Sequence, residues 1–379
     1  MQRAHVAACD LQRGDWTLVG DVPSCGVPMT YKRCGKMQKL MRFQPHTCSA
    51  WPSSGVSHEA LARSFKDALG SRRLRLIGDS MTEQHFNFIA GCLLKCNTAE
   101  QHAADLSNPK DNKEWKSALE RAGHSGKVAS TALFFIRQNH GKQPYRSGCH
   151  IAETGGRVEF RRINLLGGPK DSRIRLSEEL NATLRTLVYL PPAWGTPKAQ
   201  DIVLMNFGIH RDLLLPRHLR GVLDWWRRER LHRGAAPRLL WRQTSPQHWA
   251  GPLGLFRSFA HGDGHTAQCT QHPAALHAQG LSEYDLNVTA IIREHGDRAW
   301  SGVLPTFRAI WERSDDHAEL SQAADSRRGA VLGKLIAEAR ANGTTLLDCT
   351  HFCATGSVIT FWTQALIASL ASPTFDSLV

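Results

Sequence analysis

The sequence contains no run of apolar residues long enough to cross a bilayer, for which about 18 to 20 are needed. It also has no internal repeat, no long low-complexity tract and no apolar N-terminal stretch of the kind that forms a signal peptide. Hydrophobic residues make up 41% and charged residues 21% of its 379 positions, which excludes wholesale disorder and allows a sizeable buried core. We therefore expect either a cytosolic protein or one whose targeting segment, and any membrane association, lie outside this chain.

The ten cysteines lack the arrangement of a zinc site. Cys92-x3-Cys96 and Cys349-x3-Cys353 are tight pairs, but neither has the second Cys/His pair that usually completes a structural zinc site. Free cytosolic thiols are one interpretation. The even number favours disulfides and hence the secretory pathway, where Asn-x-Ser/Thr sequons are glycosylated. The chain has three such sequons, at Asn181, Asn287 and Asn342.

Acidic residues are outnumbered by basic ones, 34 to 47, so the formal net charge is +13. Basic residues cluster at 71–75 and at 227–233, but no nucleic-acid-binding motif adjoins them, and we expect no nucleic-acid partner. The clusters predict a solvated basic face. The alternative is a positive field that attracts an acidic glycan or an anionic membrane surface.

Regular patterning begins after residue 55. Residues 1–55 are rich in cysteine, glycine and proline, and predict a loop-rich segment that disulfides hold on a catalytic domain of residues 56–379. In that domain, apolar stretches alternate with amphipathic ones, which is typical of an α/β fold with a mostly parallel sheet covered on both faces. We expect strands near 74–77, 158–163, 202–207, 238–242 and 344–347. We expect helices near 57–69, 81–94, 217–231, 325–341 and 357–371, with insertions at about 97–130 and 251–300.

The first predicted strand of this domain runs directly into Gly78-Asp79-Ser80, where a predicted helix begins. A helix N-terminus offers free backbone N–H groups and a partial positive charge. This suits a serine whose attack creates an oxyanion, because the amide of that serine can stabilise the charge. Ser80 is therefore the candidate nucleophile and its amide a candidate oxyanion donor. The alternative is a plain strand-to-helix turn with a capping serine.

A serine hydroxyl becomes a good nucleophile only when a base takes its proton, and His351 is the candidate base. Asp348 precedes it by three residues, at the end of the last predicted strand. From there the carboxylate can reach Nδ1 of the imidazole and leave Nε2 facing the serine. His351 lies between Cys349 and Cys353, and crosslinks at both would hold the loop rigid. The alternative is a loop histidine without a role.

Other polar residues follow the predicted strands at 202–207 and 238–242. The side chain of Asn206 and the amide of Gly208 are candidate oxyanion donors, with a simple strand-ending turn as the alternative. The candidate substrate-binding residues, for which ordinary surface histidines are the alternative, are His210, Arg242 and His248.

Gly78-Asp79-Ser80 near the start and Asp348-Cys349-Thr350-His351 near the end resemble motifs of the trichome birefringence-like family, the PC-esterase branch of the SGNH/GDSL hydrolase-like superfamily. The resemblance extends over nearly the whole chain. It includes Cys9-Asp10-Leu11, Gly14-Asp15-Trp16, Phe43-Gln44-Pro45-His46-Thr47-Cys48, Cys92-Leu93-Leu94 and Arg242-Gln243-Thr244-Ser245-Pro246-Gln247-His248-Trp249. The resemblance implies a three-layer SGNH-like fold and a catalytic triad of Ser80, His351 and Asp348.

The resemblance also implies O-acetylation of polysaccharides in the Golgi lumen, with secretion as the alternative location. An acetyl group from acetyl-CoA or an acetyl ester would be carried on Ser80 and passed to a polysaccharide or glycoconjugate hydroxyl. No cofactor and no metal are expected. An acetyl esterase with the same triad, and a catalytically silent glycan-binding protein, are the alternative functions.

Four disulfides are implied by the resemblance as well. Carried over to this chain, they are Cys9–Cys48, Cys25–Cys92, Cys34–Cys353 and Cys269–Cys349. Cys96 and Cys149 are left as a further candidate pair.

Overall fold

The fold is known from a computed structural model, which describes residues 10–11, 13–21, 25, 34, 38–48, 51–52, 57–96, 109–140, 148–163, 178–189, 198–206, 215–233, 236–246, 248, 269, 282–296, 301–319 and 329–371. Its centre is a six-stranded sheet in the order β4-β5-β3-β6-β7-β8, in which only β4 is antiparallel to its neighbour. The strands are β3 (Arg73–Gly78), β4 (Gly148–Ile151), β5 (Gly156–Arg162), β6 (Ile202–Asn206), β7 (Arg238–Arg242) and β8 (Ser301–Leu304). The expected α/β class with a mostly parallel sheet is confirmed.

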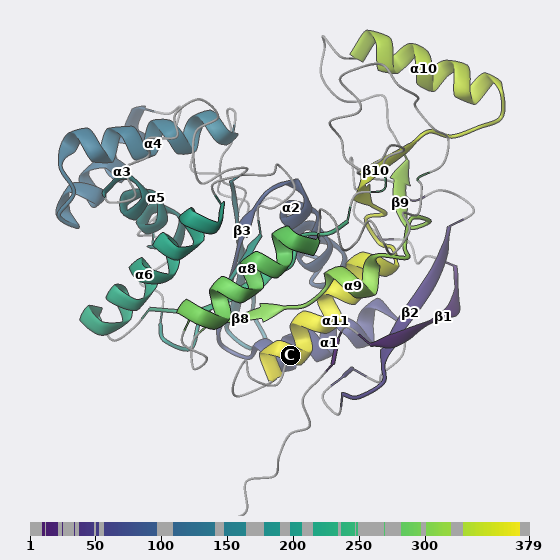
Figure 1. The fold of residues 1–379 in the computed structure, drawn as a ribbon, viewed down its shortest axis with the longest axis horizontal. Helices are drawn as coiled ribbons and strands as arrows, with labels where there is room; N and C mark the ends of the chain where they lie inside the picture. The colour runs from purple at the N-terminus through teal and green to yellow at the C-terminus, as the bar shows by residue number, and fades with distance from the viewer. Residues whose placement is uncertain are drawn as a thin grey trace, which may run out of the picture.

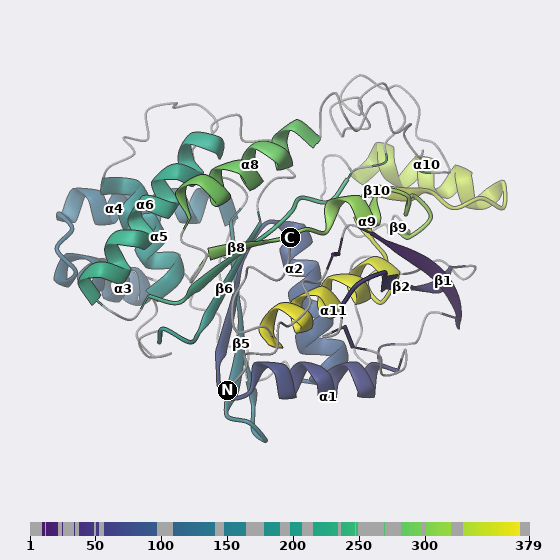
Figure 2. The same ribbon diagram turned by 60° about the horizontal axis from the view of Figure 1, so that its bottom comes forward.

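Helices cover both faces of this sheet (Figures 1 and 2). One face carries α1 (His58–Leu69), α2 (Ser80–Asn87), its π-helical continuation η1 (Phe88–Leu93) and α11 (Ser357–Ala371). The other face carries α5 (Glu178–Tyr189), α6 (Leu215–Arg233) and α8 (Ser282–His295). The remaining helices are α3 (Pro109–Arg121) and α4 (Gly126–His140), which contact α5, together with α9 (Phe307–Ile310) and α10 (Gly329–Ala341). None of the described helices is both long enough and apolar enough to cross a membrane.

The parallel strands have two buried faces, and successive side chains serve opposite helical layers. Leu74 and Leu76 of β3 pack in the cluster with α1, α2 and α11, whereas Ile77 packs with α5, α6 and α8. The side chains of β6 divide in the same way. This is why β6 reads as a continuous apolar run, as expected of a parallel strand covered on both sides.

Arg75 is a charged residue inside this buried strand. Its Nε donates to Oε2 of Glu159 at 2.6 Å, and the two residues stand opposite each other in the β3–β5 register. Both side chains are almost completely shielded from water. Removal of Glu159 would leave the buried Arg75 without its carboxylate, and an uncompensated buried charge destabilises proteins by about 3 to 5 kcal/mol.

The N-terminal segment is not only loops, which corrects the sequence-based expectation. β1 (Gly14–Asp21) and β2 (Lys39–Pro45) form an antiparallel pair. The rings of Trp16 and Phe43 lie 5.8 and 4.8 Å from that of Phe361 in α11, and Trp16 Nε1 donates to the carbonyl of Ala309 at 2.7 Å. Most other positions of β1 face solvent, so the strand has no clear apolar alternation that would predict it.

The strand expected near 344–347 differs in position and in partner. β10 spans Leu347–Phe352 and pairs antiparallel with β9 (His317–Glu319), apart from the central sheet, whose edge strand is β8 instead. Local apolar patterning predicts that a strand forms but not which strand it pairs with. The regions 97–130 and 251–300, expected as poorly patterned insertions, contain α3, the start of α4 and the whole of α8.

Four disulfides lie in the described part of the chain. Three are pairs that the resemblance implied: Cys25–Cys92, Cys34–Cys353 and Cys269–Cys349, with Cα atoms 5.2, 4.7 and 5.4 Å apart. The further candidate pair, Cys96–Cys149, is also bonded, with a Cα separation of 5.8 Å. Cys48 is disulfide-bonded as well, but its expected partner, Cys9, lies outside the described residues.

Candidate active site

Ser80 is the first residue of α2, directly after β3. Asp79 is the N-cap of this helix, and its Oδ1 accepts from the Met81 amide at 3.0 Å, so the cap leaves the Ser80 hydroxyl to other partners. Gly78 is required by close approach and not by an unusual turn. A Cβ atom there would overlap the carbonyl oxygen of Asn206 and the side chain of Thr82.

The structure brings together the three residues that the sequence nominated as a triad. Ser80 Oγ lies 2.7 Å from Nε2 of His351, and Nδ1 of His351 lies 2.9 Å from Oδ2 of Asp348. The side chain of Asp348 is 9% exposed and that of His351 is 17% exposed. A carboxylate that accepts from Nδ1–H leaves Nε2 without a proton, so the imidazole is oriented to receive the proton of Ser80.

His351 lies in a large bulge of β10. Asp348 pairs with Ala318 and Phe352 pairs with His317, so three residues of β10 loop out between two consecutive positions of β9. The second carboxylate oxygen of Asp348 stabilises this bulge, because it accepts from the amides of Thr350 and His351 at 3.2 and 3.3 Å. One side chain therefore shapes the loop with one oxygen and orients the imidazole with the other.

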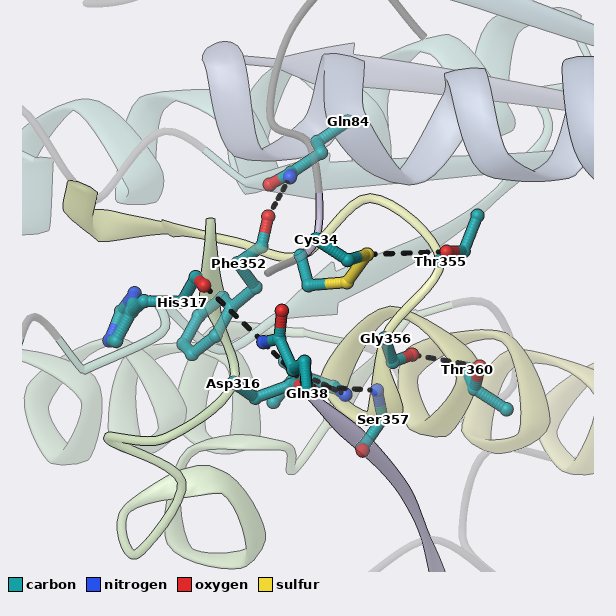
Figure 3. The surroundings of a disulfide bond; sticks show 12 residues. Cys34, Gln38, Gln84, Asp316, His317, Phe352, Thr355, Gly356, Ser357 and Thr360 are labelled. Carbon is teal, nitrogen blue, oxygen red and sulfur yellow. Dashed lines mark hydrogen bonds between the residues drawn. A yellow bond between two sulfur atoms is a disulfide. The ribbon is translucent and has the colours of Figure 1, made fainter. Parts of the chain in front are cut away.

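Hydrogen bonds from several neighbouring segments hold the rest of the loop in place. The amide of His248 donates to the carbonyl of Cys349 at 2.9 Å, and the amide of Cys353 donates to that of Asp316 at 2.8 Å. Figure 3 shows Gln84 of α2 reaching the carbonyl of Phe352, next to the Cys34–Cys353 disulfide. Because Gln84 lies on the helix that begins at Ser80, this bond connects α2 directly to the histidine loop.

The three candidate oxyanion donors differ in their surroundings. The amide of Ser80 lies in the first turn of α2, where no helical carbonyl can reach it, so it is suited to donate to an oxyanion. Asn206 is buried, and its Nδ2 donates to the carbonyl of Arg242 at 2.9 Å and to the hydroxyl of Thr244 at 3.3 Å. Its oxyanion role stays a prediction, one that requires the side chain to exchange one of these bonds. Gly208 lies outside the described residues.

Arg242 is fully buried, which corrects its assignment as a substrate-binding residue. Its guanidinium lies 4.0 Å from the ring centroid of Trp362 and donates to Nδ1 of His85 at 3.3 Å, while Nε2 of His85 bonds to Thr363 at 3.2 Å. Burial lowers the pKa of Arg242 to about 10, and Asp79 opposes this shift. Burial and the nearby Arg242 also lower the pKa of His85 well below its usual value. Arg242 therefore contacts both α2 and α11 in the protein interior and does not face a substrate.

His248 is also buried, so direct contact with a substrate is not open to its side chain in this conformation. Its Nδ1 lies 2.7 Å from Nε2 of His317, a residue that sequence reasoning missed. No motif spacing connects His317 with a loop 34 positions further along the chain. His210, the other substrate-binding candidate, lies outside the described residues.

The fold and this site define an α/β protein with a serine–histidine–aspartate hydrogen-bonded chain at the carboxyl edge of a parallel sheet. In comparisons with known proteins, no family model matches the chain and no curated protein matches it. Within the described residues, no group of three or more His, Cys, Asp or Glu side chains is arranged to hold a metal ion.

Proposed function

We propose that this protein transfers an acetyl group, through an acyl-enzyme on Ser80, to a hydroxyl of a polysaccharide or glycoconjugate. The observation that carries the proposal is the continuous chain from Ser80 Oγ through His351 to Asp348, with separations of 2.7 and 2.9 Å. Groups from two distant parts of the sequence meet at these distances in the order that acyl transfer requires.

In the proposed reaction, His351 Nε2 takes the proton of Ser80 as Oγ bonds to the acetyl carbonyl carbon. The Ser80 amide donates to the oxyanion, and the leaving alcohol or thiol receives the proton from His351. A sugar hydroxyl then gives its proton to His351 and attacks the acetyl carbon. The bond to Oγ breaks, and the proton returns to Ser80.

We further propose that the chain has the three-layer SGNH-like fold and belongs to the trichome birefringence-like family. Support comes from the parallel sheet between two helical layers, from Ser80 at the first strand-to-helix junction of the sheet, and from His351 near the C-terminus. The disulfides on both sides of the histidine loop support a secretory location, for which the Golgi lumen is our proposal.

The decisive test is intact-mass spectrometry after incubation with 4-nitrophenyl acetate. We expect a mass increase of one acetyl group, mapped by peptide analysis to Ser80, and none in S80A. Asp315, whose side chain is 63% exposed and pairs with Arg313, gives the matched control D315N, which should acquire the adduct normally. An adduct of equal yield in S80A would refute the proposed nucleophile.

Addition of candidate polysaccharides separates transfer from hydrolysis. A transferase passes the acetyl group from the acyl-enzyme to the sugar, whereas an acetyl esterase releases acetate at the same rate with and without the sugar. A protein that binds glycans but forms no adduct, and whose glycan binding is unchanged in S80A, would instead be a catalytically silent binding protein.

A further inference from the structure

Two buried histidines connect the catalytic loop to the turn that follows α9. His317 Nδ1 lies 3.0 Å from the carbonyl oxygen of His351, and its Nε2 lies 2.7 Å from Nδ1 of His248. Nε2 of His248 lies 2.9 Å from the carbonyl oxygen of Trp311. The ring of His317 also stacks on that of Phe352, with centroids 4.5 Å apart and planes 17° apart. Three hydrogen bonds thus run in series between two backbone carbonyls.

The three bonds need more protons than two neutral rings possess. A carbonyl oxygen only accepts, so the ring nitrogen that faces it must carry a proton. This applies to Nε2 of His248 and to Nδ1 of His317. The bond between the rings needs a third N–H, but two neutral imidazoles have one N–H each. The complete set of bonds therefore exists only when one ring is an imidazolium.

His248 is the better carrier of the extra proton. Protonated on both nitrogens, it donates to the Trp311 carbonyl and to Nε2 of His317, and His317 stays neutral with its proton directed at His351. Burial lowers the pKa of His317 to about 3, and the nearby His248 lowers it too, while the His351 carbonyl and Asp348 act in the opposite direction. A positive charge is thus disfavoured on His317 itself.

Among the described residues, charged side chains of β10 act on His317. β10 contributes Asp348 and His351. Asp316 is next to His317 in the chain, but its carboxylate accepts from the amides of Ser357 and Val358 and lies 3.8 Å from the guanidinium of Arg313. The carboxylate of Asp348 acts to raise the pKa of His317, but burial outweighs it.

We propose that His317 is a positioning residue for the general base: its Nδ1–H holds the carbonyl of His351, and His248 in its doubly protonated form fixes the tautomer in which His317 does so. The inference rests on the proposed role of His351 as base. Rotation of the peptide unit of His351 would move its imidazole relative to Ser80. A donor that holds the carbonyl of this unit therefore maintains the 2.7 Å separation between Nε2 and Oγ.

The proton positions can be measured without any activity assay. Long-range proton–nitrogen NMR correlations of 15N-histidine-labelled protein, assigned with H248N and H317N, report which ring nitrogens are protonated. In spectra recorded at about pH 5, we expect His317 to be the Nδ1–H tautomer and both nitrogens of His248 to be protonated, because only that arrangement completes the three hydrogen bonds. An Nε2–H tautomer at His317, or an unprotonated nitrogen at His248 at that pH, would overturn the proton assignment.

A matched pair of variants tests positioning against packing. The side-chain amide of Asn stands near the place of Nδ1, so H317N can still donate to the His351 carbonyl, whereas the amide of Gln in H317Q stands near the place of Nε2. Misplacement of a catalytic group by about 1 Å can lower rates by about 100-fold. For turnover of 4-nitrophenyl acetate, we expect kcat to fall by about that factor in H317Q and by clearly less in H317N, with KM little changed.

If His317 only filled space, H317Q would have a higher kcat than H317N, because Gln is closer to His in volume. Equal activities, or a less active H317N, in variants that are equally folded by circular dichroism would therefore overturn the positioning role. Failure of the proposed function looks different: wild-type protein and S80A would then turn over the ester equally, while the NMR proton positions would stand or fall on their own.

Discussion

At the scale of single residues, two buried carboxylates near the loop act in different ways. Asp348 gives one oxygen to the imidazole of His351 and the other to amides of the loop. Asp316 accepts from the amides of Ser357 and Val358, at 3.2 and 2.7 Å, and so caps α11, the helix that follows the loop. The first carboxylate orients an imidazole as well as backbone amides, whereas both oxygens of the second accept from backbone amides.

The substitution D348N tests the tautomer. The remaining carbonyl oxygen can still accept from the Thr350 and His351 amides, but the new NH2 group would face Nδ1 and force the proton of His351 onto Nε2. We expect ester turnover to fall by about 10,000-fold with little loss of stability. A variant that keeps more than a tenth of wild-type kcat would show that Asp348 does not govern the proton of His351.

The substitution D316N tests whether Asp316 makes the free energy of unfolding depend on pH. Burial raises the pKa of Asp316 to about 6, although Arg313 and the helix amides oppose this. The folded state therefore binds this proton more tightly than the unfolded state, for which the pKa is about 3.9. This contribution to stability is complete below about pH 4 and is lost as the pH rises through about 6.

We therefore expect wild-type protein to lose up to about 3 kcal/mol relative to D316N between about pH 4 and pH 7. Urea unfolding of both proteins across this range measures the difference, and D224N, at an exposed position of α6, serves as the control. A constant difference between wild type and D316N would show that the pKa of Asp316 does not change on folding.

At the scale of elements, the strand-to-helix junction and the β10 bulge each offer one reacting group. β3 ends beside β6, and α2 begins at once, so the backbone of Gly78 must pass close to Asn206. Gln84 of α2 then bonds to the carbonyl of Phe352 on the bulge. The distance between α2 and the β10 bulge is fixed, because the two elements are bonded to each other as well as to the sheet.

The substitution G78A should disturb this junction. The added methyl group would overlap the Asn206 carbonyl and Thr82, and overpacking of this kind destabilises proteins by about 1 to 3 kcal/mol. We expect a lower midpoint in urea and reduced acetylation of Ser80. The matched control is G126A, where the new Cβ meets only the flexible ends of Glu120 and Lys116. Equal stabilities of the two variants would contradict this role of Gly78.

At the scale of the whole molecule, disulfides connect the N-terminal segment to the histidine loop. Cys34 and Cys353 are 319 positions apart in the chain, yet they are bonded beside the bulge, and Figure 3 shows Gln38 of the same segment at the carbonyl of His317. Cys269 is bonded to Cys349 at the other end of the loop. The loop is therefore held by covalent links from both directions.

The double variant C34A/C353A removes one of these links without leaving a free thiol. We expect a loss of about 2 to 5 kcal/mol in unfolding free energy and, in the folded fraction, slower acetylation of Ser80. C96A/C149A removes a crosslink between β4 and the segment that follows η1 and is the control: it should lose stability but keep the acetylation rate. Equal rates in both double variants would show that the Cys34–Cys353 link does not help to hold the loop.

The sequence by itself determined the α/β class, four strands of the central sheet and the three residues of the Ser80–His351–Asp348 hydrogen-bonded chain. These features are encoded locally. A fully apolar run such as β6 forms a strand buried on both faces, and Ser57, whose side chain accepts from the Ala60 amide at 3.2 Å, marks the start of α1 as expected.

Only the tertiary structure decided that β10 pairs with β9, that Arg242 and His248 are interior residues, and that His317 reaches the loop that carries His351. Strand partners and burial depend on contacts between residues far apart in the chain. An arginine that stacks on a buried tryptophan has the same local sequence pattern as one that faces a substrate. Chain proximity cannot distinguish the two, because the free energies that separate them arise from packing and from the exclusion of water.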